Sequence, residues 1–186
     1  MAEIKQKFET KNMVLCAIFA AICCVCSIIT IPTGIVPVTL GTFGVMVTAL
    51  NLGGKRGEIS TAIFIVLGII GIPVFSGING GIGVIAGPTG GYIYSFLLMV
   101  PIIGLMSKKL NKSIKTISIA FLGCLLAILV CYAVGTAHFM IVMSTKGNAE
   151  GLFSALTMCV FPFIPFDILK AIIAILIAIR LKPICK

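Results

Sequence analysis

The chain has 186 residues, of which 60% are hydrophobic and only 10% charged, and its mean hydropathy is +1.24. Soluble domains carry about 25% charged residues, so this composition excludes a soluble enzyme or binding domain and predicts an integral membrane protein. The formal net charge of +9 would suggest nucleic-acid binding in a soluble chain, but here the positions of the basic residues indicate membrane topology instead.

Six apolar segments follow one another, each close to the length that crosses about 30 Å of hydrocarbon. They comprise residues 13–31, 38–52, 59–75, 90–106, 116–143 and 166–179. The second is short and the fifth long, which predicts tilt or partial insertion. Residues 152–163 are also apolar, so the sixth segment can begin earlier, interrupted by Pro162 and Pro165. The sequence predicts an all-α integral membrane protein with six transmembrane helices, in one transmembrane domain spanning residues 1–186.

Basic residues lie before the first apolar segment, after the last one, and in every second connection between segments. They precede the first segment, separate the second from the third and the fourth from the fifth, and follow the sixth. These residues are Lys5, Lys7, Lys11, Lys55, Arg56, Lys108, Lys109, Lys112, Lys115, Arg180, Lys182 and Lys186. The intervening connections contain one cation, Lys146, accompanied by Glu150. Because basic loops stay in the cytoplasm, both termini are predicted to be cytoplasmic.

The connections predicted on the outer side are rich in Gly and Pro. Residues 31–39 and 71–92 carry no charge and are apolar enough to fold back into the membrane. Irregular backbone at that depth is tolerated only where protein buries it or where it lines a cavity. These outer loops are therefore expected to form a ligand pocket.

Asp167 and Lys170 are the only charged residues between Glu150 and Arg180. A charge at the centre of a bilayer costs at least about 2.5–3.5 kcal/mol, so a pair on one helical face requires an explanation. One explanation is structural: Asp167 would lie in the first helical turn after Pro165, and Lys170 would extend to the interface. The other is a binding site for a small ligand with N–H, C=O and acid groups, in which the two side chains supply an acceptor and a donor.

Asn79 is the only amide side chain in the outer loops. Asn before Gly commonly forms a turn, but an amide also matches the edge of a cyclic urea. The run from Gly81 to Ala86 resembles a dinucleotide-binding loop only loosely, and no acidic residue follows at the required distance. Tight turns explain these glycines better.

Other motifs have structural interpretations. The eight cysteines lie almost entirely in apolar runs and are expected to be buried hydrophobic residues, with no metal site. Ser76 and His138 lack the turn of a hydrolase, and no polar stripe indicates a channel. No phosphate-binding loop is present, so nucleotide hydrolysis would come from a partner. Ala17 and Ala21, four residues apart, would let another helix approach, either within the chain or from a partner.

Four motifs together resemble the BioY family, the biotin-binding S components of energy-coupling factor (ECF) transporters. They are VPVT at 36–39, GIPVFSG at 71–77, GPTGGY at 87–92 and PFDILK at 165–170. The resemblance covers nearly the whole chain and implies six helices, an outward-facing biotin pocket and a lid between the first two helices. It further implies a transmembrane coupling subunit (EcfT), two cytoplasmic ATPases, and a multi-pass protein of a prokaryotic plasma membrane.

The resemblance also implies roles for individual residues. Asn79, Asp167 and Lys170 match positions that hold the polar head of biotin, and Ala17 and Ala21 match the face toward the coupling subunit. The motifs add Thr39, Thr89, Gly90, Gly91 and Tyr92 as substrate-binding candidates. Gly41 stands where many members would have glutamine. The biotin carboxylate could meet Lys170, Tyr92, Tyr132 or His138.

The expected function is capture of external biotin and its delivery to the cytoplasm, with biotin as transported ligand, no cofactor, no catalytic residue, and lipid rather than nucleic acid as surroundings. An S component for another vitamin is the alternative. Charged thiamine would favour acids or aromatics in the outer loops, and the chain has no tryptophan there or elsewhere.

Overall fold

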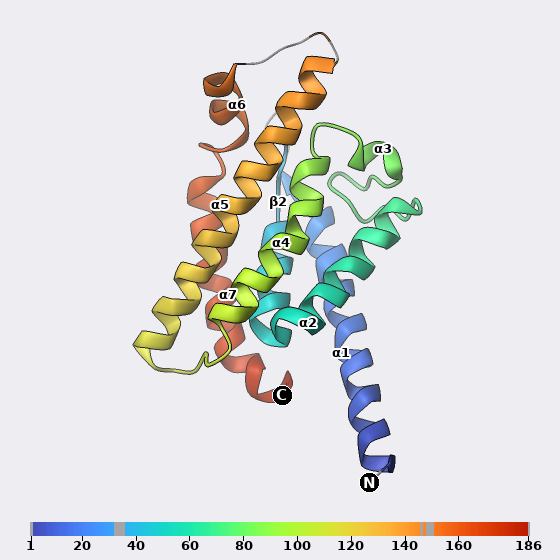
Figure 1. The fold of residues 1–186 in the computed structure, drawn as a ribbon, viewed down its shortest axis with the longest axis vertical. Coiled ribbons are helices and arrows are strands. Elements are labelled where there is room, and N and C mark those ends of the chain that lie inside the picture. The colour runs from blue at the N-terminus through green and yellow to red at the C-terminus, as the bar shows by residue number, and fades with distance from the viewer. Residues whose placement is uncertain (1, 32–35, 146, 148–150, 186) are drawn as a thin grey trace.

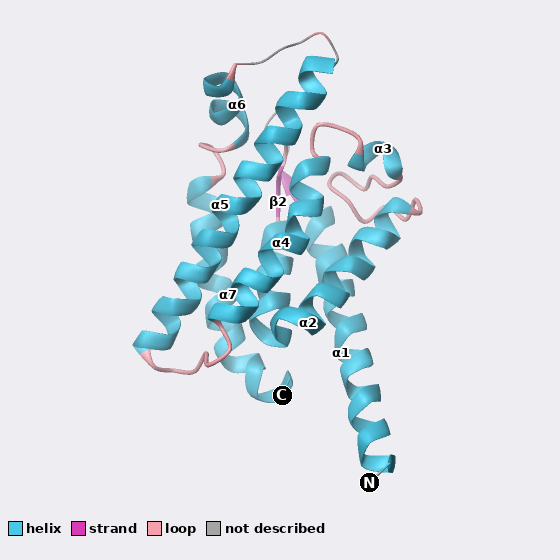
Figure 2. Ribbon diagram, in the orientation of Figure 1, coloured by secondary structure: helices cyan, strands magenta, loops and turns pink. Residues whose placement is uncertain are grey.

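The computed structural model describes residues 2–31, 36–145, 147 and 151–185, and within them seven helices and a two-stranded ribbon (Figures 1 and 2). The long helices are α1 (Ala2–Ile28), α2 (Gly41–Ile69), α4 (Gly90–Met106), α5 (Ile114–Thr145) and α7 (Ile164–Cys185). The short helices are α3 (Ile82–Ile85) and α6 (Leu152–Cys159). The fold is all-α, as predicted, apart from the ribbon.

The ribbon lies in the first outer connection. Strands β1 (Thr30–Ile31) and β2 (Val38–Thr39) pair antiparallel, with Thr30 opposite Thr39 and Ile31 opposite Val38. Nothing in the sequence predicted this pairing. It brings the end of α1 beside the start of α2, and residues 32–35 of the same predicted loop lie outside the described residues.

Helix α2 combines the second and third predicted segments. Its backbone leaves helical geometry at Gly53, where φ is 76° and ψ is −169°. An L side chain is strained at that φ, which explains the glycine. Figure 1 shows the chain turning back within α2 at the lower end of the molecule. Each half therefore corresponds to one predicted apolar segment.

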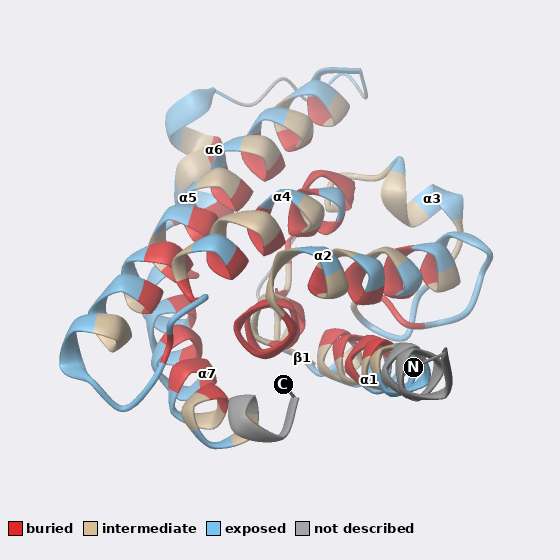
Figure 3. Ribbon diagram, turned by 60° about the horizontal axis from the view of Figure 1, so that its bottom comes forward, coloured by how far each residue is buried: buried red, intermediate tan, exposed pale blue. Residues whose placement is uncertain are grey.

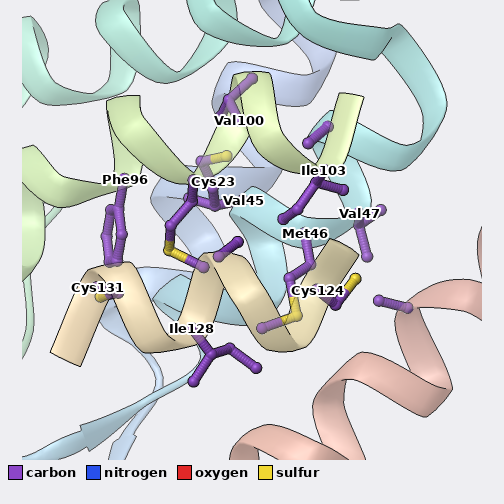
Figure 4. Close-up of a cluster of buried hydrophobic side chains, with 14 of the residues drawn as sticks. Cys23, Val45, Met46, Val47, Phe96, Val100, Ile103, Cys124, Ile128 and Cys131 are labelled. Carbon is purple, nitrogen blue, oxygen red and sulfur yellow. The ribbon is translucent and has the colours of Figure 1, made fainter. Parts of the chain in front are cut away.

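The first half of α2 lies at the centre of the bundle. Val45, Met46 and Leu50 are fully buried, and α2 packs against α1, α4 and α7. Figure 4 shows Val45, Met46 and Val47 within one apolar cluster that α1, α4 and α5 also enter. Figure 3 shows buried residues facing this interior and exposed ones facing outward. Because the outward surface holds many large apolar side chains, such as Leu129 and Leu176, it suits contact with lipid.

By length and composition, two described helices could span a membrane: Thr10–Ile28 and Ile114–Thr145. A third span arises if α6 and the stretch Ile164–Leu181, bent by 45°, are taken together. This bend falls at the predicted interruption near Pro162. Helix α4 is apolar but shorter. Six spans, counting both halves of α2, thus remain a prediction.

The predicted basic and uncharged connections lie at opposite ends of the molecule. Both chain ends, the bend of α2 and the α4–α5 connection are at the lower end in Figure 1, and the ribbon, α3 and α6 are toward the upper end. Lys55 and Arg56 follow the bend, and Lys108 to Lys115 lie in or next to the α4–α5 connection. Lys146, Glu150 and Lys186 lie outside the described residues. This separation is the one that the positive-inside rule requires, and the orientation in the membrane stays a prediction.

Gly104 sets how closely α4 approaches the bend of α2. A Cβ atom on Gly104 would lie 2.7 Å from Gly54 Cα and 2.9 Å from Gly53 C. These are backbone atoms, so the helices would have to separate. We expect Gly104→Ala to lower the free energy of unfolding by about 1–3 kcal/mol, measured by thermal unfolding in detergent.

Gly54→Ala is the matched control, because a Cβ atom there meets nothing within 4 Å. It should leave the melting temperature unchanged or raise it slightly, since alanine favours helix. Equal destabilisation by the two variants would contradict the close approach of α4 to this bend.

Candidate functional site

Asp167 and Lys170 lie on one face of α7, close to its start. Asp167 is in the first turn, its backbone N–H donating to Phe163 O at 2.9 Å. The two residues are only 2% and 7% exposed, and Lys170 Nζ lies 2.8 Å from Asp167 Oδ1. Lys170 therefore does not extend to the interface, and the purely structural explanation based on such an extension is wrong for this residue.

Three other elements complete the surroundings of the ion pair. Lys170 Nζ donates to Thr39 O in β2 at 2.7 Å and to Thr42 Oγ1 in α2 at 3.2 Å. Thr42 in turn donates to Asp167 Oδ1 at 3.0 Å. On α5, the Tyr132 hydroxyl donates to Asp167 Oδ2 at 2.6 Å. The carboxylate is thus held by hydrogen bonds from α2, α5 and α7.

The number of hydrogen bonds that each charged group already makes shows which of the two can bond to a ligand. An ammonium has three N–H donors, and those of Lys170 are used by Asp167, Thr39 and Thr42. A carboxylate has about four acceptor positions, of which Lys170, Thr42 and Tyr132 use three. The remaining acceptor capacity is on Oδ2. Asp167 can therefore accept a bond from a ligand, whereas Lys170 would first have to give one up.

The network borders a cavity of about 410 Å³, which is within the usual range for small-molecule sites. The cavity lies among the ribbon, the loop after α2 and helices α1, α4, α5 and α7. Its lining residues are Ser27, Thr30, Val36, Pro37, Thr39, Thr42, Ser76, Gly77, Asn79, Val84, Thr89, Tyr92, Ile93, Phe96, Cys131, Tyr132, Cys159, Phe163, Asp167 and Lys170.

A second cluster of polar residues lies where the loop after α2 meets β1, just beyond the end of α1. Thr30 Oγ1 is 3.3 Å from Ser76 Oγ and accepts the Gly77 N–H at 3.3 Å. Asn79 Nδ2 donates to Ser76 O at 2.8 Å, and Asn79 pairs with Phe75 through the backbone. Asn79 is thus both a turn residue and part of the cavity lining, so its two interpretations are compatible.

The structure brings six of the eight predicted substrate-binding residues to this cavity: Thr39, Asn79, Thr89, Tyr92, Asp167 and Lys170. Gly90 and Gly91 are not in its lining. A Cβ atom on Gly90 would collide with Ile85 O, and one on Gly91 would lie 2.5 Å from His138 Cβ and 3.0 Å from Gly135 Cα. These glycines let α4 pack against its preceding loop and against α5, and their direct contact with a ligand stays a prediction.

The four residues predicted as possible contacts of the ligand carboxylate have different surroundings in the structure. His138 lies outside the cavity lining, with Nε2 3.0 Å from Gly87 O and its ring edge-on to Tyr94. Tyr92 lines the cavity, and its hydroxyl lies 3.2 Å from Thr136 Oγ1. Tyr132 and Lys170 are already engaged with Asp167. Ser76 contacts Thr30 rather than His138, so the geometry gives no support to a hydrolytic pair.

Sequence reasoning missed Thr42 and the cluster of Ser27, Thr30 and Ser76. A hydroxyl in an apolar segment carries little signal, because it can bond to its own helix. Gly41 lies among these residues: a Cβ atom there would be 3.1 Å from Thr39 Oγ1 and 3.5 Å from Phe96 Cζ. A larger residue at position 41 would crowd the cavity wall, so glycine keeps space there.

Ala17 and Ala21 are both exposed on α1, whereas Ala20 is buried inside the bundle. The small-residue face formed by Ala17 and Ala21 is therefore accessible at the surface of the described chain. Among the described residues, no three His, Cys, Asp or Glu side chains converge in a way that could hold a metal ion.

Fold and site together define a helical membrane protein that encloses a small-molecule cavity next to a buried carboxylate. The chain matches the model of the BioY family over residues 3–186. It is 35% identical to the biotin transporter BioY of Thermotoga maritima, covering 92% of this chain and 96% of that protein. It is 38% identical to the probable biotin transporter BioY of Pyrococcus horikoshii, covering 94% and 98%.

A solved structure has the same fold. It is the crystal structure of the S-component for biotin from an ECF-type ABC transporter, with a TM-score of 0.79 and 30% identity, covering 95% of this chain and 93% of that one. The chain belongs to the BioY family, a family of transporter subunits rather than enzymes.

Removing Lys170 should expose the dependence of the buried carboxylate on its partner. We expect Lys170→Met to lower the free energy of unfolding by about 3–5 kcal/mol, because Asp167 stays buried without a counter-charge. Adding Asp167→Asn to the same chain should recover part of that loss, since the two residues act as one unit. Thermal unfolding without ligand measures both effects.

Lys108→Met serves as the control, because Lys108 is exposed and has no partner among the described residues. It should change stability by less than about 0.5 kcal/mol. Additive losses in the double variant would show that Asp167 and Lys170 are not coupled.

Proposed function

We propose that this chain is the biotin-binding membrane subunit of an ECF uptake system, which captures biotin outside and delivers it to the cytoplasm. The observation that carries the proposal is the buried Asp167 carboxylate in the wall of a 410 Å³ cavity, in a chain that belongs to the BioY family. Relatives named as biotin transporters align over nearly their full length and support it.

The polar head of biotin is a cyclic urea with two N–H donors and one carbonyl acceptor. Asp167 Oδ2 retains an acceptor position, and the Tyr132 oxygen, which donates its proton to that carboxylate, can itself accept. These two oxygens would receive the ureido N–H groups. Hydrogen bonds to a charged acceptor are about twice as strong as neutral ones, which favours a urea over an ester or ether of similar shape.

Asn79 would complete the contact with the ureido ring. Its amide uses one N–H for Ser76 O and has a second N–H to offer to the ligand carbonyl. Lys170 would act as a positioning residue, because its three donors hold Asp167, Thr39 and Thr42. This differs from the expectation that Lys170 donates to the ligand directly.

The apolar part of the ligand would lie against the hydrophobic wall of the cavity. Phe96, Phe163 and Ile93 are buried apolar residues of this wall, and Tyr92 and Thr89 adjoin them. Sites with few polar anchors and a mostly apolar lining suit a fused ring system with an aliphatic chain. Gly90 and Gly91 would act indirectly, by keeping α4 and Tyr92 close to α5.

In the proposed topology the protein spans a prokaryotic plasma membrane six times, with the basic end of the bundle in the cytoplasm and the cavity toward the outside. Transport would require a transmembrane coupling subunit and two cytoplasmic ATPases. The ECF-type context of the structural relative supports such partners in general. The exposed alanines on α1 would form the contact with the coupling subunit.

Asp167→Asn tests the binding site. The substitution keeps the size of the side chain but removes its charge, so biotin should bind at least about thirtyfold more weakly. Isothermal titration of ligand-free protein in detergent measures the dissociation constant, with thiamine and riboflavin as ligand controls.

Glu58→Gln makes the same chemical change away from the cavity lining and should leave the affinity unchanged. If the Asp167 variant bound biotin as tightly as the native chain, the assignment of the carboxylate would be wrong. Preference of the native chain for thiamine or riboflavin would instead assign it to another vitamin.

Ala17→Leu combined with Ala21→Leu tests the partner surface. The bulkier side chains would keep another helix from approaching α1, so biotin uptake by cells producing the coupling proteins should be abolished. Binding by the purified variant should be preserved, because both alanines lie outside the cavity lining.

Helix α5 offers a matched control, since Ala133 and Ala137 have the same spacing and are also exposed. Replacing both with leucine should preserve binding and uptake. Loss of binding in the α1 variant would mean that Ala17 and Ala21 serve the fold, and equal loss of uptake in both variants would argue against a specific face.

A further inference from the structure

A second hollow lies on the side of the bundle, between the connection into α5 and the last turns of α7. It has a volume of about 700 Å³, and Lys112, Ile117, Ile173, Leu176 and Arg180 are among its lining residues. We call it the α5–α7 groove. It opens because α7 packs more extensively on α2 than on α5.

The groove has two chemically different parts. Ile173 and Leu176 on α7 are exposed and form an apolar floor together with the half-buried Ile117 on α5. Lys112 and Arg180 contribute charge, and both are exposed. Within the described residues neither cation has a hydrogen-bond or ion-pair partner, and the acid of α7, Asp167, is engaged with Lys170 instead.

The groove is at the basic end of the molecule and away from α1. Lys112 belongs to the α4–α5 connection, which Figure 1 shows at the same end as the chain termini. Figures 1 and 3 show α1 on a different side of the bundle from α5 and α7, and α1 is the helix that carries Ala17 and Ala21. A partner that contacts the alanine face would leave this groove accessible.

We propose that the α5–α7 groove binds an anionic phospholipid. The phosphate group pairs with Arg180 and Lys112, and an acyl chain lies along Ile173 and Leu176. The guanidinium fork of arginine matches phosphate oxygens, and a basic pocket between transmembrane helices is a recognised setting for anionic headgroups. The inference rests on the proposed membrane topology but not on biotin binding, so either can fail alone.

Tryptophan fluorescence provides a direct test, because the chain contains no tryptophan. Ile173→Trp places a single fluorophore in the groove, and Leu126→Trp places one on α5 outside the groove lining. The native residues are 41% and 42% exposed, so both sites contact the lipid phase to a similar extent. Each variant is reconstituted in phosphatidylcholine bilayers and titrated with acyl-brominated phosphatidylglycerol or phosphatidylcholine, whose bromines quench tryptophan.

The groove site should prefer phosphatidylglycerol at least about fivefold over phosphatidylcholine, the gain expected for even one nearby cation. The Leu126→Trp site should show less than half of that preference. Adding Lys112→Ala and Arg180→Ala should remove the preference at position 173. The same preference at both positions, or its persistence without the two cations, would overturn the proposal.

Native mass spectrometry of the chain without any tryptophan provides an independent measurement, in case tryptophan itself fills the groove. Lys112→Ala with Arg180→Ala should reduce retained phosphatidylglycerol at least about fivefold. Lys108→Ala with Lys109→Ala removes the same amount of charge from the α4–α5 connection, outside the groove lining, and should have less than half of that effect. Equal losses in both pairs would indicate general attraction to a basic surface and would refute a built site.

Discussion

The buried pair of Asp167 and Lys170 is the interaction on which the rest of the site depends. Two charges with almost no exposure are tolerated only if they pair and their remaining bonding positions are filled. Thr39, Thr42 and Tyr132 fill all but one of them, and these residues come from β2, α2 and α5. One ion pair of α7 thus fixes three other elements around the cavity and leaves an acceptor available in its wall.

The bend at Gly53 makes this arrangement possible. By reversing the chain, it lets the first half of α2 occupy the centre of the bundle, where Thr42 reaches α7, while the second half lies alongside α4. Glycines at close helix contacts have the complementary role, because Gly91, Gly104 and Gly135 bring α4 against α5 and α2. Backbone approach, rather than side-chain chemistry, explains most of these glycines.

The sequence predicted those site residues whose polar or charged side chains are unusual in an apolar membrane chain. Asp167 and Lys170 stood out because charges are costly in an apolar segment, and Asn79 because its loop holds no other amide. Thr42 and Thr30 gave no such signal, since a hydroxyl is unremarkable in an apolar helix and only tertiary contacts reveal its partners. The packing role of Gly90 and Gly91 was not visible in the sequence, because a glycine-rich motif looks alike in a ligand loop and in a helix contact.

We propose that Asp167 and Tyr132 bind the ureido end of biotin, and that Lys170 orients Asp167 without contacting the ligand. A structure of the native chain with biotin bound tests this most directly. We predict a ureido nitrogen about 2.7–3.2 Å from Asp167 Oδ2, with the bonds of Lys170 to Thr39 and Asp167 preserved. A ligand bound the other way round, with its carboxylate on Lys170 Nζ and its ureido ring away from Asp167, would contradict the account.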